Sequence, residues 1–346
     1  MKHVDVFVGP AHDLVHTALM LTGLCALSAR GEISLAYHHA RGESGWLSAD
    51  PMVVVMDLHD AAVTRVAIDL RDGEGVSQPI IDRVDVYFKR AFYPPESERW
   101  PQYAAKFLPF GFNYGCRSIR STVRLLAAIG GPLAMTGRAG IDRLKQYLLT
   151  PAPDVFELDA STPVEPMVAF QTRLWTPEEV APGESEPLNT ERLAIVRALK
   201  QAFGARFVGG LVPTVFARQH YPDDLTPHSS KYAQYLRIKK RCLVSVYTRG
   251  VEHSLAFKLG ETFAAAQCLV SVPLKYGLPV PIEVGRHYLE YQGVDACLAA
   301  CERLLADADL ARSMRNANQD YYRREIEPSA KLTRVFERVA AWRRAL

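Results

Sequence analysis

Short apolar runs alternate with helical patterns along this chain, and this alternation limits its fold more than any other feature. The run Val4 to Val8 closes at Gly9-Pro10, and apolar residues then recur at helical spacing from Leu14 to Cys25. Ile33 to Tyr37 reads as the next strand. A strand–helix–strand order of this kind predicts a parallel sheet with helices packed against it.

The same alternation begins again after a proline-rich stretch. Residues 151–166 contain four prolines in a mostly polar setting, which is typical of a linker between domains. Strand patterns at 167–171 and 242–247 then surround a helical pattern at 189–203. The predicted fold class is therefore α/β, with two Rossmann-like, doubly wound domains that face a central cleft. The expected boundaries are 1–155 for the first domain, 165–326 for the second, and 327–346 for a last helix that packs back across the domains.

The composition fits two cores and argues against several partners. The chain has 346 residues, of which 48% are hydrophobic, and its formal net charge of +3 gives no reason to expect a nucleic-acid partner. The six cysteines include no C-x-x-C pair and fit buried, reduced thiols in the cytoplasm. No apolar run reaches the roughly 18 residues of a membrane span, and the first residues lack the apolar core of a signal peptide. We therefore expect a cytoplasmic protein. The alternative is peripheral association with the membrane through the helical segment 329–346.

One turn and the helix pattern after it carry the clearest chemistry. Arg249 and His253 lie in the turn, and Ser254, Lys258 and Glu261 follow at helical spacing on one face. Cations at a strand-to-helix turn suit a diphosphate, and a carboxylate suits ribose hydroxyls. The alternative is a solvated helix face in which Lys258 pairs with Glu261.

Other strand ends add candidates for the same ligand. Arg173 lies just past a strand pattern, where its guanidinium could meet a diphosphate with two hydrogen bonds; the alternative is a structural arginine stacked on Trp175. Gly209-Gly210 follows a further strand pattern and would permit a tight turn near phosphate. The candidate donor-binding residues are Arg173, Gly209, Gly210, Tyr247, Arg249, Gly250, Ser254, Lys258 and Glu261.

The first half offers candidates for catalysis and for acceptor binding. His12 or Asp13 could serve as a general base, although Asp13 also fits the N-cap of the following helix. Lys89-Arg90 could bind an anionic acceptor or form ion pairs, and Asn113-Tyr114 could line the cleft or be buried. The catalytic candidates are His12, Asp13 and His253, and the acceptor-binding candidates are Lys89, Arg90, Asn113 and Tyr114.

Several familiar motifs are missing. The sequence contains no Gly-x-Gly-x-x-Gly, no P-loop and no Cys/His spacing typical of a metal site. This disfavours a dehydrogenase and a P-loop ATPase. We expect no metal and no cofactor, with a nucleotide diphosphate sugar as co-substrate.

The second half resembles the GT-B glycosyltransferases, which have two Rossmann-like domains, and among them the bacterial members similar to glycosyltransferase family 1. The first half resembles the same group more faintly, at 86–90 and 109–114. The matching segments of the second half are 170–175, 188–192, 207–211, 247–250, 254–261, 273–277 and 318–322.

The resemblance implies that the first domain binds the acceptor and the second the nucleotide sugar. Glu261 resembles the glutamate that holds the ribose, and Arg173 resembles the arginine that meets the diphosphate, with Thr172 in place of a glycine. Many retaining members have two glutamates eight positions apart, whereas here His253 stands eight positions before Glu261, so the stereochemical outcome stays open. In an inverting enzyme His12 would be the base, and in a retaining enzyme His253 would face the donor sugar.

Together these observations predict a metal-independent glycosyltransferase of the hexosyltransferase type, active in polysaccharide biosynthesis. It would move a sugar from a UDP-, GDP- or dTDP-sugar to a glycan or lipid-linked glycan at the cytoplasmic face of the membrane. The alternatives are a nucleotide-sugar epimerase or hydrolase of the same fold, and a non-catalytic docking protein.

Overall fold

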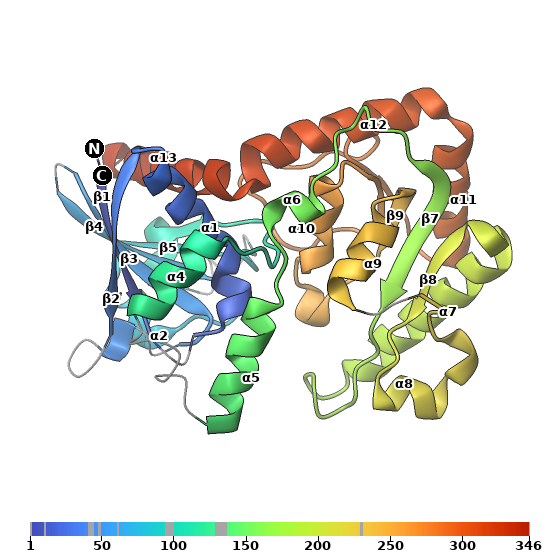
Figure 1. Ribbon diagram of the computed structural model, residues 1–346, viewed down its shortest axis with the longest axis horizontal. Coiled ribbons are helices and arrows are strands. Elements are labelled where there is room, and N and C mark those ends of the chain that lie inside the picture. Colours follow the sequence, from blue (N-terminus) through green and yellow to red (C-terminus); the bar gives the residue numbers. More distant parts are fainter. Residues whose placement is uncertain are drawn as a thin grey trace. The chain divides into compact units, whose positions relative to one another are not determined.

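The computed structural model describes residues 2–9, 12–40, 45–47, 50–60, 62–93, 100–128, 137–228 and 231–345, and it divides into two compact units (Figure 1). The first unit comprises Met1–Pro153, Tyr276–Val280 and Arg324–Leu346, and the second comprises Asp154–Lys275 and Pro281–Arg323. Each unit is built on one sheet with helices packed against it. The predicted α/β class with two Rossmann-like units is confirmed.

The sheet of the first unit has the strands β1 (Lys2–Val8), β2 (Ile33–His39), β3 (Val53–His59), β4 (Val63–Asp69), β5 (Val86–Lys89) and β6 (Phe107–Pro109). The helices described in this unit are α1 (Leu14–Ala29), α2 (Gln78–Ile81), α4 (Ile119–Ala128), α5 (Gly137–Leu148) and α13 (Pro328–Ala345), with a 3₁₀ turn η2 (Pro101–Lys106).

The strand order is β2-β1-β3-β4-β5-β6, and one strand departs from the expected parallel arrangement. β1 and β2 are parallel, as the strand–helix–strand pattern predicts, but β3 is antiparallel to both β1 and β4. Only residues 60–62 connect β3 to β4. A connection this short can join antiparallel strands and is too short for the crossover that parallel strands need.

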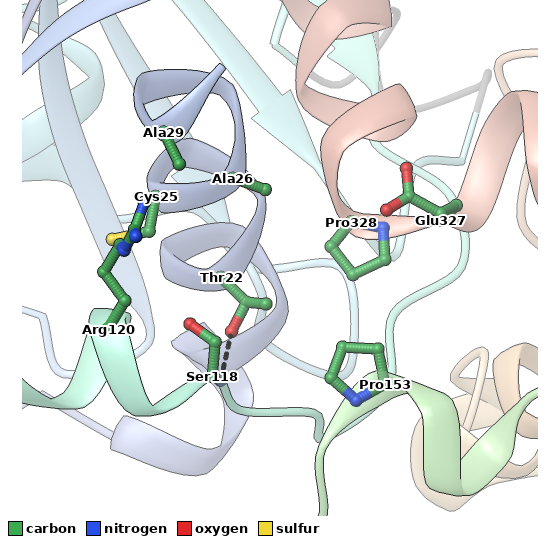
Figure 2. A pocket seen from close by; sticks show the side chains of 9 residues that line it. All are labelled: Thr22, Cys25, Ala26, Ala29, Ser118, Arg120, Pro153, Glu327 and Pro328. Atoms are coloured by element: carbon green, nitrogen blue, oxygen red, sulfur yellow. Dashed lines mark hydrogen bonds between the residues drawn. The ribbon is translucent and has the colours of Figure 1, made fainter. Parts of the chain in front are cut away.

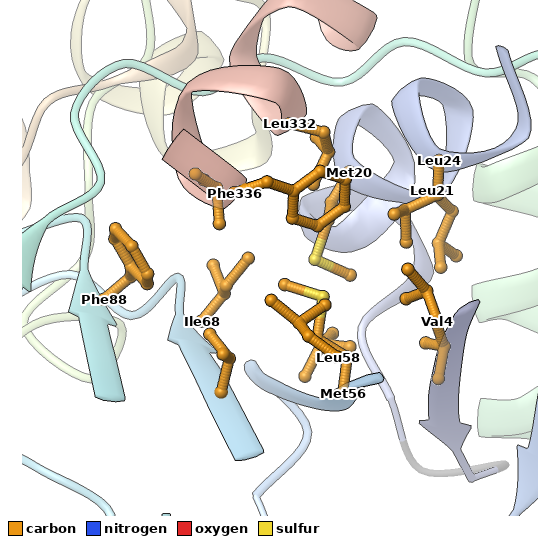
Figure 3. Packing of buried hydrophobic residues seen from close by; sticks show 14 of the residues in the cluster. Val4, Met20, Leu21, Leu24, Met56, Leu58, Ile68, Phe88, Leu332 and Phe336 are labelled. Atoms are coloured by element: carbon orange, nitrogen blue, oxygen red, sulfur yellow. The ribbon is translucent and has the colours of Figure 1, made fainter. Parts of the chain in front are cut away.

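The larger apolar cluster described in the first unit lies between this sheet and two long helices, α1 and α13 (Figure 3). Val4 of β1 and Met56 of β3 point into it from the sheet. Gly23 lets the helices approach closely, since a Cβ there would lie 2.1 Å from the carbonyl oxygen of Pro328. Phe336 and its apolar neighbours on α13 are buried in this core. The apolar face of the last helix is therefore not available to a membrane, which corrects that alternative.

The sheet of the second unit has the strands β7 (Glu165–Thr172), β8 (Phe207–Leu211), β9 (Cys242–Tyr247), β10 (Cys268–Ser271) and β11 (Tyr288–Glu290). Its main helices are α7 (Ser185–Phe203), α8 (Val215–His220), α9 (Tyr232–Lys239), α10 (Phe257–Ala264), α11 (Val294–Ala306) and α12 (Ala308–Tyr321), and α6 (Pro153–Phe156) begins at the boundary between the units. Shorter turns are η4 (Gly204–Arg206), η5 (Pro222–Asp224) and η6 (Val251–His253), and the π-helix η7 (Tyr322–Ile326) follows α12.

All strands of this second sheet run parallel, in the order β11-β10-β9-β7-β8. The carboxyl ends of β7, β9 and β10 therefore meet at one edge, where ligands bind in open α/β sheets. α7 begins at Ser185, four residues before the helical pattern predicted at 189–203.

Two further expectations concern the cysteines and the membrane. All six cysteines are buried and none forms a disulfide, which confirms the prediction of buried thiols. Within the ranges given above, no helix has both the length and the apolar character needed to cross a membrane.

Candidate nucleotide-binding site

Two neighbouring cavities lie at the carboxyl ends of the parallel strands of the second unit. The smaller has a volume of about 160 Å³ and is lined by residues that follow β7 and β9, among them Arg173, Thr248 and Lys258. The larger has a volume of about 360 Å³ and is lined by Arg249, His253 and the segment after β10. Arg249 and His253 of the turn and Lys258 of α10 thus lie at the edge where a ligand is expected. Ser254 and Glu261 line neither of these two cavities.

Lys258 is one of three cations, with Arg173 and Arg192, that line the smaller cavity. Its Nζ atom donates a hydrogen bond to the carbonyl oxygen of Gln171 and lies 5.8 Å from the centre of the Phe170 ring. Burial lowers the pKa of Lys258 to about 7, and the nearby positive charges of Arg192 and Lys239 add to this effect. An anion in the cavity would favour the charged form of this lysine.

Arg192 of α7 is a second buried cation, and sequence reasoning missed it. Its Nη1 donates to the carbonyl oxygen of Arg173 at 2.6 Å, and its Nη2 donates to that of Arg249 at 3.1 Å. Arg192 therefore links the segment after β7, which contains Arg173, to the segment after β9, which contains Arg249. Burial lowers the pKa of Arg192 to about 10. Its position four residues after the buried Leu188 places it on the inner face of α7, and a basic residue on such a face was the available signal.

Arg173 adopts the arrangement named as its structural alternative. Its guanidinium carbon lies 4.2 Å from the centre of the Trp175 ring, and the same side chain forms an ion pair with Glu179. Asn189 fixes the backbone of Trp175 through two hydrogen bonds, of 3.0 and 2.7 Å. The role of Arg173 toward a diphosphate stays a prediction.

Arg249 faces two carboxylates that sequence reasoning did not single out. Its Nη1 lies 3.4 Å from Oε1 of Glu184, and its Nε lies 3.7 Å from Oε2 of Glu191. Burial raises the pKa of Glu191, and the charges of Arg249 and Arg192 oppose this shift. A phosphate entering here would compete with these two carboxylates for the guanidinium.

The turn η6 holds an unusual backbone between β9 and α10. Glu252 and His253 have φ angles of 52° and 59°, a left-handed conformation that non-glycine residues seldom adopt. Gly250 is required just before them, because a Cβ there would lie 2.5 Å from Oγ of Ser254. Tyr247 stabilises the turn by donating from its hydroxyl to the carbonyl oxygen of Ser254 at 2.7 Å. Two strained residues in sequence, one of them lining a cavity, are typical of a functional site.

Glu261 is buried and has partners within the protein. The hydroxyl of Tyr232 donates to Oε1 at 2.5 Å, and Nζ of Lys239 lies 3.4 Å from Oε2. The ion pair of Glu261 is thus with Lys239 of α9, and the alternative that paired it with Lys258 is wrong. Burial lowers the pKa of Lys239, and Glu261 opposes that shift. The ribose-binding role of Glu261 stays a prediction, and it would require the carboxylate to change partners.

Gly209 and Gly210 do not form a turn after a strand, because both lie inside β8. A Cβ on Gly209 would lie 1.9 Å from the carbonyl oxygen of Phe170. Gly210 has a φ of +123°, and a Cβ there would lie 2.7 Å from the backbone nitrogen of Thr226. The close approach of neighbouring backbone explains both glycines without a phosphate.

His12 lies in the first unit and is buried. Its Nδ1 accepts a hydrogen bond from the backbone N–H of Gly9 at 2.8 Å, so the proton is on Nε2, which donates to the carbonyl oxygen of Val53 at 3.1 Å. Burial lowers the pKa of His12, and the hydrogen bond from Nε2 to Val53 opposes this shift only in part. Both ring nitrogens are engaged in holding the loop after β1, an arrangement that favours a structural role.

Asp13 is the N-cap of α1, as its structural alternative predicted. Its Oδ1 accepts hydrogen bonds from the backbone N–H groups of Val15 and His16, both at 3.0 Å. Burial alone would raise the pKa of Asp13, but the interactions with His16 and Val15 outweigh it, and the pKa is lowered.

Lys89 and Arg90, predicted to bind the acceptor, are buried in the first unit. Nζ of Lys89 donates to the carbonyl oxygen of Gly75 at 2.8 Å and lies 3.4 Å from Oδ2 of Asp69. Arg90 forms an ion pair with Asp72. These contacts agree with the alternative expectation that Lys89 and Arg90 form ion pairs.

Asn113 and Tyr114 are also buried. Nδ2 of Asn113 donates to the carbonyl oxygen of His16 at 2.9 Å, and the Tyr114 side chain is enclosed by the unit. The acceptor-binding role of these residues stays a prediction, and their burial favours the structural alternative.

Comparisons with known proteins give information about the fold alone. No family model matches the chain, and neither does any curated protein. Among solved structures it is similar to a putative UDP-N-acetylglucosamine 2-epimerase from Listeria monocytogenes, at 10% identity over 98% of this chain and 96% of that one, with a TM-score of 0.45. It is also similar to a glycosyltransferase from Rickettsia africae, at 8% identity over 92% and 79%, with a TM-score of 0.43.

A third similar structure is Anabaena HepE in complex with UDP and glucose, at 12% identity over 91% of this chain and 88% of that one, with a TM-score of 0.36. The matched proteins include glycosyltransferases, the class that the sequence resembles. With identities and TM-scores this low, the likenesses carry no argument about activity or ligand.

Proposed function

We propose that the chain is a glycosyltransferase whose second unit binds a nucleoside diphosphate sugar. The observation that carries this proposal is the set of cations at the carboxyl ends of β7 and β9, where Lys258 and Arg249 line adjoining cavities. Cations at this edge of a parallel sheet are suited to a diphosphate. The likeness to solved glycosyltransferases agrees with the proposal and does not carry it.

The chemistry that this site supports is stabilisation of a departing diphosphate. Negative charge develops on the leaving group when the bond to the sugar breaks, and preorganised cations lower the energy of that transition state. Lys258 and Arg249 would supply this charge without a metal ion. His253 lines the larger cavity on a strained turn, whereas both ring nitrogens of His12 are engaged with Gly9 and Val53.

The donor proposed is a UDP-, GDP- or dTDP-sugar, and the acceptor a glycan or a lipid-linked glycan of polysaccharide biosynthesis. Both substrates are cytoplasmic or face the cytoplasm. A nucleotide-sugar epimerase or hydrolase would use the same cations but would need no second sugar.

A calorimetric titration with UDP, GDP, dTDP and CDP tests the proposal. We expect one diphosphate to bind the wild type, and we expect Lys258→Met and Arg249→Met each to weaken that binding by about tenfold or more. The matched control is Arg312→Gln, which removes an exposed cation from α12 of the same unit. Absence of binding to all four diphosphates by folded protein would contradict the proposal.

Turnover then separates the enzyme classes. A transferase consumes the matching nucleotide sugar faster when glycan acceptors are added. Consumption that no acceptor accelerates would assign the site to a hydrolase, and interconversion of two nucleotide sugars would assign it to an epimerase. Diphosphate binding without any turnover would favour the docking protein.

A further inference from the structure

An acidic segment lies in the chain between two cations of the candidate nucleotide-binding site. Residues 176–191, called the acidic segment below, contain five glutamates and no other charged residue, so their formal charge is −5. Arg173 precedes the acidic segment and Arg192 follows it. The whole chain has a formal charge of +3, so this negative charge is a local concentration. Such a concentration repels anions, and its place beside a site for a diphosphate therefore requires an explanation.

Three of these glutamates form ion pairs with arginines of the site. Glu179 pairs with Arg173, which lines the smaller cavity. Glu184 and Glu191 both pair with Arg249, which lines the larger cavity together with Glu191. Carboxylates of one segment therefore occupy a cation in each of the two cavities.

Glu184 is the most enclosed of the three glutamates. Its side chain is 12% exposed, compared with 29% for Glu191 and 35% for Glu179. Its Oε1 atom also accepts a hydrogen bond from the backbone N–H of Glu252, which belongs to the strained turn η6.

The second carboxylate oxygen of Glu184, Oε2, is buried and has no hydrogen-bond partner among the described residues. A buried polar atom without a partner has lost its hydration without compensation, which is unfavourable. The carboxylate of Glu184 thus takes the place of a bound anion, with a guanidinium and a backbone N–H as donors, but only one of its oxygens is satisfied.

An acid and a base in the wall of one cavity need not pair, as a cavity of about 290 Å³ in the first unit shows (Figure 2). Arg120 and Glu327 both line this cavity. Arg120 forms no ion pair with any residue that the structure describes. The carboxylate of Glu327 instead accepts hydrogen bonds from Oγ of Ser329 at 2.6 Å and the backbone N–H of Ala330 at 2.7 Å. Pairing of the lining arginines is therefore not a feature of every cavity in this chain.

We propose that the acidic segment is an internal competitor of the diphosphate. Its carboxylates would occupy Arg173 and Arg249 in the ligand-free protein and would have to leave them before a diphosphate binds. The proposal rests on the proposed function, because it concerns the regulation of the same site. Groups tethered close to a site face it at an effective concentration of roughly millimolar. They lower the apparent affinity in proportion to the fraction of molecules in which the site is open.

Titration calorimetry with inorganic pyrophosphate tests the proposal on the full chain, because this probe needs neither a base nor a sugar. We expect Glu184→Gln and Glu191→Gln each to bind pyrophosphate about fivefold or more tightly than the wild type. Glutamine has nearly the same size as glutamate and can still accept the hydrogen bond from Glu252. The turn η6 therefore keeps this contact in Glu184→Gln while the negative charge is lost.

The matched control is Glu186→Gln, which removes the same charge from the same segment. Glu186 is exposed and forms no ion pair with a described residue. At about 150 mM salt, charges that lie beyond roughly 8 Å are screened, so the control should bind like the wild type. Unchanged circular dichroism and melting temperature would show that each variant is folded.

The outcomes separate this proposal from the proposed function. The proposal is overturned by unchanged or weaker pyrophosphate binding in the two folded variants, by equal tightening in Glu186→Gln, or by no pyrophosphate binding in any of the proteins. If the wild type nevertheless binds a nucleoside diphosphate, the proposed function stands without the competitor. Tighter pyrophosphate binding by the two variants, in a protein that binds none of the four nucleoside diphosphates, would support the competition and contradict the nucleotide ligand.

Discussion

Nζ of Lys239 lies 3.4 Å from Oε2 of Glu261, and both side chains are only 3% exposed. The two residues come from α9 and α10, and Tyr232 completes the arrangement with a hydrogen bond to the same carboxylate. Glu261 is also the residue for which the sequence resemblance implies ribose binding. One carboxylate therefore has a structural partner and a proposed ligand, and tests of function must separate the two.

We expect Glu261→Ala to destabilise the second unit, whether or not a nucleotide binds there. The substitution leaves the ammonium of Lys239 buried without its carboxylate, and breaking a buried pair in this way costs about 3–5 kcal/mol. Urea denaturation followed by circular dichroism measures the loss in the free energy of unfolding. A variant as stable as the wild type would show that the ion pair contributes nothing to folding.

The double variant Lys239→Met/Glu261→Leu is the matched control, because it removes both charges together. We expect it to recover most of the lost stability, since apolar residues of similar size often replace a buried pair without loss. If the double variant folds well but no longer binds the diphosphate that the wild type binds, the carboxylate acts on the ligand as well as on Lys239.

Diphosphate affinity is expected to fall as the pH rises through about 7, the pKa to which burial lowers Lys258. Below that pH the ammonium is charged and attracts the anion, whereas above it the neutral amine does not. Titration calorimetry at about pH 6 and about pH 8 compares the two states of this lysine.

A nucleoside diphosphate also titrates in this range, since a phosphate monoester has a second pKa of about 6. The decisive quantity is therefore the pH dependence of the wild type compared with that of Lys258→Met. An identical pH dependence in both proteins would contradict a role for Lys258 in attracting the ligand.

His12 should make the first unit sensitive to acid. Burial holds the pKa of His12 below its ordinary value of 6.5, so the folded state binds fewer protons than the unfolded state between these two values. Stability therefore rises with pH through this window and is lost as the pH falls below about 6.5. Melting temperatures measured across this range should fall less steeply in His12→Asn, and an equal slope in both proteins would contradict the assignment.

The candidate site could be predicted from the sequence to the extent that it depends on strand ends. Arg249 and Lys258 follow β9, and the carboxyl ends of parallel strands share one edge, so their proximity to Arg173 follows from the strand pattern. Asp13 as an N-cap could be predicted for a similar reason, because a cap bonds only to the next few residues.

Partners that are distant along the chain could not be predicted. Nothing in the spacing of Glu261 indicates that Lys239 is its partner, since that pairing depends on how α9 packs beside α10. The burial of Lys89 and the cross-linking role of Arg192 likewise depend on tertiary packing. The antiparallel direction of β3 could not be predicted, because an apolar run does not indicate the direction in which a strand runs in its sheet.

Gly209→Ala distinguishes packing from phosphate binding as the reason for a glycine in β8. A methyl group there would lie 1.9 Å from the carbonyl oxygen of Phe170 on the neighbouring strand, so β7 and β8 would have to separate. We expect a loss of more than about 2 kcal/mol in the free energy of unfolding, with or without nucleotide, because backbone gives way less easily than a side chain. Gly75→Ala is the control, since nothing lies within 4 Å of the added Cβ, and a change of at most about 0.5 kcal/mol is expected there. The explanation would be contradicted if Gly209→Ala were as stable as the wild type and bound the diphosphate more weakly. Gly209 would then be assigned to the ligand site.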